Sequence, residues 1–73
     1  MLVLKLIFER GSKRYEIDCK KEYSGTTHAI KRGKEVLKSF QDIERATIKI
    51  IEQATNQVKK ELAFNKGVWR IIK

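Results

Sequence analysis

The chain of 73 residues contains no proline, one cysteine, one histidine, one tryptophan and four glycines. A single cysteine excludes an intramolecular disulfide, and no Cys/His cluster exists that could hold a structural metal. The absence of proline and the few glycines argue against a low-complexity segment. With 41% hydrophobic and 36% charged residues, the composition predicts one small globular domain over residues 1–73, with a thin core.

Long apolar runs are missing as well. The longest, Met1–Leu4 and Leu6–Phe8, fall far short of the roughly 20 residues that a membrane-spanning helix needs. The N-terminus shows no basic stretch ahead of an apolar run and no small-residue cleavage site, so a signal peptide is not expected. Together with the lack of disulfides, these features predict a cytoplasmic protein with no membrane contact.

Acidic residues are few beside the basic ones, since 17 Lys and Arg stand against 9 Asp and Glu, for a formal net charge of +8. The excess is concentrated in residues 26–41 and 58–73, whereas residues 42–57 carry more acidic than basic side chains. A strongly basic small domain favours an anionic partner, usually nucleic acid, because Lys and Arg release condensed counterions from phosphates.

Residues 2–20 alternate between apolar and polar side chains, which is the periodicity of β-strands. A turn at residues 10–13 would fold them into an antiparallel hairpin, followed by a polar loop over residues 20–27. One register satisfies both faces, because it sets apolar residues opposite each other on one side and opposite charges on the other. The predicted pairs are Leu4–Cys19, Leu6–Ile17, Phe8–Tyr15, Lys5–Asp18 and Glu9–Arg14.

Residues 27–40 permit two structures. A turn at Gly33-Lys34 would form a second hairpin, because glycine suits the first position of a type II′ turn. A helix is the alternative, although glycine within a helix costs roughly 1 kcal/mol relative to alanine. We favour the hairpin over the helix. The residues that fall at helical spacing are Ile30, Gly33, Leu37 and Phe40.

Residues 41–64 contain nothing that breaks a helix, and we predict one of about 22–24 residues there. Ser39 is a suitable N-cap, and Asn65-Lys66-Gly67 supplies a left-handed stop. Residues 68–72 then read as a last strand. The predicted fold is α+β in the order β-β-β-β-α-β, with two hairpins and a C-terminal strand in one antiparallel sheet packed against the helix.

The apolar side chains of the predicted helix spread over roughly 200° of arc, whereas packing on a small sheet needs only about 100°. The surplus indicates a second covered surface, and hence a homodimer or a small protein-interaction module. A sheet curling around the helix, or a singly exposed Ile48, would explain it equally well. The interface residues assigned on this basis are Ile48, Ile51 and Leu62.

Nothing in the sequence indicates catalysis. Cys19 falls on the core face of the first hairpin, and His28 has no carboxylate or second histidine nearby in sequence to orient it. The glycine-rich motifs that cradle phosphates are absent. We therefore expect a protein that is not an enzyme and has no metal, no cofactor and no small-molecule substrate.

Nucleic-acid binding through phosphate contacts is the function that the sequence favours, with a solubilising basic surface as the simpler alternative. Tyr15, Tyr23 and Trp69 are available to stack on unpaired bases, although a tryptophan in a small domain more often anchors the core. No pattern of side chains indicates base-specific readout. The candidate contact residues are Lys31, Arg32, Lys34, Lys38, Lys59, Lys60, Lys66 and Arg70.

Overall fold

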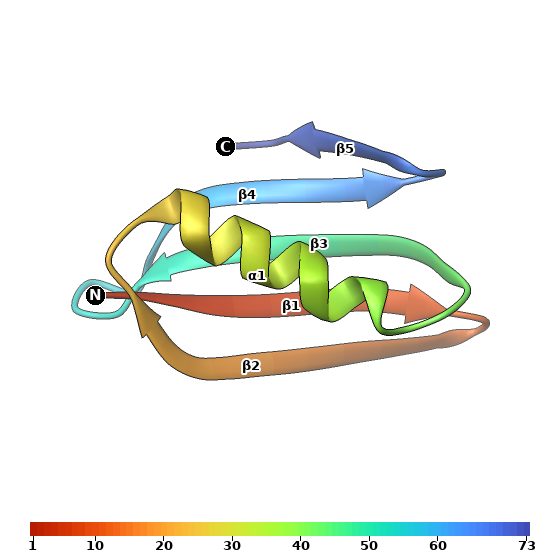
Figure 1. Ribbon diagram of the computed structural model, residues 1–73, viewed down its shortest axis with the longest axis horizontal. Coiled ribbons are helices and arrows are strands. Elements are labelled where there is room, and N and C mark those ends of the chain that lie inside the picture. Colours follow the sequence, from red (N-terminus) through yellow and green to blue (C-terminus); the bar gives the residue numbers. More distant parts are fainter.

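The computed structural model describes residues 1–73 and contains one open sheet of five antiparallel strands with a single helix lying across one face (Figure 1). The strand order is β2-β1-β3-β4-β5, which makes β1 and β3 neighbours although the second strand and the helix separate them in sequence. The predicted α+β class is confirmed. No helix has the length and apolar character needed to span a membrane. The elements are β1 (Leu2–Arg10), β2 (Lys13–Tyr23), α1 (Thr26–Lys38), β3 (Ile43–Glu52), β4 (Gln57–Asn65) and β5 (Val68–Ile71).

The β1–β2 hairpin has the register expected from the alternation of its residues. All five predicted pairs are present. β2 continues as far as Tyr23, so half of the loop expected over residues 20–27 is part of the strand. On the charged side, Lys5 and Arg14 each form an ion pair with Glu16 at 3.9 Å. Glu16 lies diagonally across the hairpin from Lys5, and two residues from Arg14 on the same strand. Such exposed pairs add little stability, and the register is fixed by the apolar side of the hairpin.

The favoured hairpin over residues 27–40 is wrong, because α1 occupies this segment as in the helical alternative. Gly33 explains the outcome. It faces the sheet, where an added Cβ would lie 3.1 Å from Cδ1 of Ile48 and 3.3 Å from Cδ2 of Leu6. The absence of a side chain lets the helix approach the sheet closely, and the packing gained by this approach offsets the helix-forming cost of glycine.

Ser39 ends α1 and does not begin a second helix. Its hydroxyl donates a hydrogen bond to the carbonyl of Val36 at 2.6 Å, and the backbone N–H of Phe40 donates to the carbonyl of Leu37. These bonds satisfy carbonyls that the last turn of a helix leaves without partners. Asp42, with a φ of 61°, then directs the chain into β3.

The long helix predicted over residues 41–64 is also wrong, because this segment forms the antiparallel strands β3 and β4. Asn56 makes the reversal between them in a left-handed conformation, with a φ of 59°, and its N–H donates to the carbonyl of Glu52 at 2.7 Å. β-branched side chains favour strands over helices because their χ1 freedom is restricted against the preceding helical turn. The β-branched residues of these two strands are Ile43, Thr47, Ile48, Ile50, Ile51 and Val58.

Residues Val68–Ile71 form a strand, as expected. The left-handed residues before it form the turn of a hairpin. Lys66 and Gly67 have φ values of 51° and 79° and form the two-residue turn between β4 and β5. This pair of left-handed residues is typical of the type I′ turn, whose twist matches that of antiparallel strands. The conformation was predicted correctly, but it joins two strands and does not end a helix.

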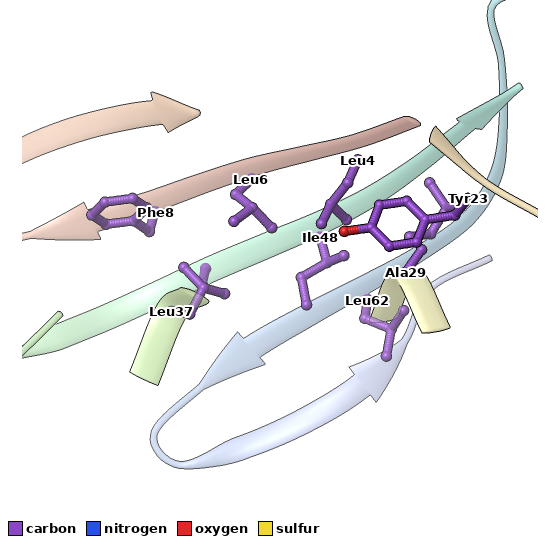
Figure 2. Close-up of a cluster of buried hydrophobic side chains, with 10 residues drawn as sticks. Leu4, Leu6, Phe8, Tyr23, Ala29, Leu37, Ile48 and Leu62 are labelled. Atoms are coloured by element: carbon purple, nitrogen blue, oxygen red, sulfur yellow. The ribbon is translucent and has the colours of Figure 1, made fainter. Parts of the chain in front are cut away.

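The core lies between α1 and the covered face of the sheet (Figure 2). Its largest fully buried side chains come from the two central strands, Leu4 and Leu6 from β1 and Ile48 and Ile50 from β3. Tyr23 closes one end of this layer. The helix contributes its small and apolar positions, Ala29, Gly33 and Leu37.

Replacing Gly33 with alanine should destabilise the protein by about 1–2 kcal/mol, even though alanine is the better helix former, because the added Cβ would press on Ile48 and Leu6, which are fully buried. Urea unfolding followed by circular dichroism measures the change. In the double variant with Ile48→Val, which lacks the Cδ1 atom at 3.1 Å, the loss should be smaller than the sum of the single losses. Additive losses, or a more stable Gly33→Ala protein, would contradict this account.

Candidate nucleic-acid interface

The helix leaves part of its own side of the sheet uncovered. α1 packs mainly against β1 and β3 and reaches β2, and the hairpin of β4 and β5 extends beyond it (Figure 1). Between the C-terminal half of α1 and this hairpin lies an open hollow of about 400 Å³, called here the aromatic groove. Its lining residues are Lys34, Leu37, Lys38, Phe40, Ile43, Ala46, Phe64 and Trp69.

Aromatic side chains form one side of the groove. Phe64 on β4 is paired with Trp69 on β5, and their ring centroids lie 5.1 Å apart with the planes tilted by 50°. Phe40, from the segment after α1, contacts Phe8 at a centroid distance of 4.9 Å. Phe40, Phe64 and Trp69 are each only half-buried, so parts of their rings remain open to a ligand.

Two lysines of α1 stand on the other side of the groove. Lys34 and Lys38 are one helical turn apart, and Nζ of Lys34 lies 5.4 Å from the centroid of the Trp69 ring. An ammonium group at this distance is attracted to the negative face of the indole. The groove therefore combines exposed aromatic rings with two mobile positive charges.

The first predicted basic cluster lies entirely on α1 but does not converge on one spot. Lys34 and Lys38 line the aromatic groove, whereas Lys31 and Arg32 line a polar hollow on the side of α1 that faces the end of β2. Arg32 also forms an ion pair with Glu35, the only acidic residue of the helix, at 3.6 Å. Of the four residues, two contribute to the groove.

The second predicted cluster is dispersed. Lys60 is paired with the buried Ile50 and so shares the helix side of the sheet, whereas Arg70 is paired with Ala63 on the opposite face. Lys66 is in the β4–β5 turn. Lys59 lines a hollow with Met1 and Glu52 at the other end of the sheet. Of the eight predicted contact residues, those on the helix side of the sheet are consequently Lys31, Arg32, Lys34, Lys38 and Lys60.

The three residues assigned to an interface do not share a surface. Ile48 is fully buried and Leu62 is 5% exposed, both beneath α1 (Figure 2). Ile51 lies half-buried on the opposite face, because successive residues of a strand point to opposite sides of the sheet. The wide helical arc from which this interface was inferred does not exist, so its three residues give no support to a dimer.

Cys19 lies on β2 and His28 on α1. Cys19 is half-buried opposite Leu4, and burial raises the pKa of its thiol, which the nearby guanidinium of Arg32 partly counteracts. A raised pKa reduces the thiolate fraction at neutral pH and with it the nucleophilicity. His28 is exposed on α1. No three His, Cys, Asp or Glu side chains come together as a set of metal ligands.

Phe40 and Phe64 belong to the groove but were not singled out in the sequence. The signal for Phe64 was the turn at Lys66-Gly67, because a two-residue hairpin turn there pairs Phe64 with Trp69. Phe40 carried no comparable signal. Its position depends on where α1 ends and how that end packs on β1.

Comparisons of the chain with protein-family models, with curated proteins and with solved structures find no match.

The pKa of Cys19 gives a test of how α1 lies over β2. The rate of alkylation by iodoacetamide, followed against pH, should reach half its maximum at a higher pH in the folded protein than in the same protein in urea, because burial disfavours the thiolate. In Arg32→Gln the midpoint should rise further, since this variant lacks the positive charge that lowers the pKa of the Cys19 thiol. Equal midpoints for folded and unfolded protein would show that the thiol is not buried in this way.

Proposed function

We propose that this protein is a non-catalytic nucleic-acid-binding module that takes a single strand into the aromatic groove. The observation that carries the proposal is the combination of the Phe64–Trp69 pair with Lys34 and Lys38 in one open hollow. A nucleotide presents the same two chemistries, since it joins a flat π-system to a phosphate anion. Surfaces that bind single strands without sequence preference combine stacking aromatics with a positive track for the backbone.

Stacking is the first component. A base–aromatic stack contributes about 1–3 kcal/mol and tolerates any base, because each base has a π-face. Trp69 stands on the outermost strand and remains half-exposed, so a base reaches its ring without displacing the core. The bases of a duplex are stacked on each other, and their faces are not available to such a ring. The aromatic side of the groove thus favours an unpaired base.

Phosphate neutralisation is the second component. Lys34 and Lys38 project from α1 on flexible four-carbon stems, so each ammonium can follow a phosphate next to the stacked base. Lys31 on the helix and Lys60 on β4 add positive charge on the helix side of the sheet, but outside the lining of the groove. With a net charge of +8, the protein also attracts a polyanion over a longer range at low salt.

Sequence-specific readout is not part of the proposal. Six of the eight residues that line the groove are apolar or aromatic, and the other two are lysines. Such a lining offers no amide or carboxylate to match the hydrogen-bonding edge of a particular base. Affinity should therefore depend on salt and on the presence of unpaired bases more than on their identity.

The double variant Lys34→Gln/Lys38→Gln should weaken binding to a labelled 12-nucleotide single strand and make it less sensitive to salt. Each lost phosphate contact on a single strand reduces the slope of log K against log salt by roughly 0.7, so two contacts reduce it by about 1.4. Fluorescence anisotropy at several salt concentrations measures the slope.

The matched control for this experiment is Lys5→Gln/Lys49→Gln, which removes the same charge from two paired neighbours on the sheet face away from α1. Its slope should stay close to that of the parent protein. If both double variants change the slope equally, the protein binds by bulk charge, and the groove is not the site. If the parent shows no binding at low ionic strength, the proposal is wrong as a whole.

Trp69 tests the stacking component, and as the only tryptophan it is also an intrinsic fluorophore. Its emission should be quenched when the single strand binds. Trp69→Leu should lower affinity roughly 5- to 150-fold, which corresponds to one lost stack, whereas Trp69→Phe should retain most of it. Equal affinities for the leucine and phenylalanine variants, together with unquenched emission in the parent, would exclude stacking on this ring.

A further inference from the structure

The two edges of the sheet differ in chemistry. β2 forms one edge and carries charged side chains along most of its length, including Lys13, Arg14, Glu16 and Asp18. Such charges discourage pairing with another strand. β5 forms the other edge and lacks this protection, since Arg70 is its only charged residue. The apolar side chains exposed along this edge are Val68 at 56%, Ile71 at 67% and Ile72 at 59%.

The backbone of this edge also has free hydrogen-bonding groups. The N–H of Ile72 donates to the carbonyl of Glu61 on β4 at 2.8 Å and so points into the sheet, and the N–H and C=O of Lys73 also bond with Glu61. Along an antiparallel edge strand, successive residues direct their backbone N–H and C=O groups alternately toward the neighbouring strand and away from it. The backbone groups of Trp69 and Ile71 therefore point away from β4, toward the open edge. These groups lie at an open edge with exposed apolar side chains on either side.

We propose that a second copy of this chain occupies the edge, with β5 of each copy paired antiparallel about a two-fold axis. An antiparallel strand pair of this kind is self-complementary, so one surface patch provides both halves of the interface. The exposed apolar side chains of one β5 edge are best covered by another apolar edge, and a second copy of the chain has the same edge. The axis runs perpendicular to the sheet, so the pair forms one continuous sheet of ten strands with both helices on the same side.

The side chains select a register within this arrangement. Centring the axis on Arg70 would place two guanidinium groups directly opposite each other, which is unfavourable. Centring it on Ile71 pairs that residue with itself, uses its outward backbone groups, and sets Arg70 opposite Ile72 of the other copy. Trp69 then lies opposite Lys73 of the other copy, whose own N–H and C=O are bonded to Glu61, so the backbone hydrogen bonds of the pair are those between the two Ile71 residues.

Charge makes this association respond to salt in a characteristic direction. Each copy carries +8, so the two repel each other and added salt should strengthen the dimer by screening. Nucleic-acid binding has the opposite dependence, because salt weakens it. The proposal stands independently of the nucleic-acid proposal, and both the association and its salt dependence are measured without nucleic acid.

Sedimentation equilibrium of the parent protein, at concentrations from micromolar to millimolar, should show a monomer–dimer equilibrium that shifts toward dimer between low and high salt. Ile71→Lys should raise the dissociation constant at least tenfold, because it introduces two facing charges at the centre of the interface. It should leave the fold intact, because Ile71 is 67% exposed. Ser12→Lys, in the exposed β1–β2 turn, adds the same charge elsewhere and should dimerise like the parent at high salt.

Hydrogen exchange identifies the strand involved. The amide of Ile71 should exchange fast in dilute protein and become protected as the concentration rises, whereas the inward amide of Ile72 should be protected at both concentrations. A parent protein that remains monomeric to millimolar concentration at high salt would overturn the proposal. So would a dimer that Ile71→Lys leaves unchanged, or one in which the amide of Ile71 gains no protection.

Discussion

The close approach of α1 to the sheet at Gly33 is the contact on which the rest of the structure depends. With no Cβ at this position, the helix settles onto Leu6 and Ile48, the fully buried centres of the two middle strands. A helix is about 10 Å wide and neighbouring strands are about 4.8 Å apart, so one helix covers roughly two strands. In this protein the strands that the helix covers are mainly β1 and β3. The chain has no second helix to cover β4 and β5 (Figure 1).

The aromatic groove and the free edge share this origin. The alternation of β4 and β5 points Phe64 and Trp69 to the helix side, where a wider layer of helices would bury them. They remain half-exposed because α1 crosses the sheet diagonally and runs toward β1 and β2, away from the β4–β5 turn (Figure 1). Lys34 and Lys38 face the same opening because the helical repeat places them to one side of the buried stripe that contains Gly33 and Leu37. The groove thus exists because one helix covers only part of this face of the sheet, and its positive charge comes from two lysines of that helix.

The sequence allowed the first hairpin to be predicted with its register, because its apolar and charged sides independently selected the same pairs. The hairpin favoured for residues 27–40 and the helix predicted over residues 41–64 were wrong for two physical reasons. Gly33 was counted only as a cost to a helix, and its benefit appears only when Leu6 and Ile48 lie beneath it. The 41–64 segment has no proline or glycine at its reversal, which Asn56 makes instead. The groove could not be predicted, because it unites α1 with β4 and β5, and the predicted fold had no helix at α1.

Trp69 connects the two proposals, because its ring lines the groove while its backbone lies on the free edge. If β5 pairs with β5 of a second copy, the two grooves open on the same side of one continuous sheet, on either side of the two-fold axis. A strand long enough to reach both would then neutralise the repulsion between the copies as it binds. Binding and association are linked reciprocally, so a strand that binds the dimer more tightly must favour the dimer by the same factor. A short strand confined to one groove provides no such bridge, and the length of the nucleic acid would decide whether the two equilibria are coupled.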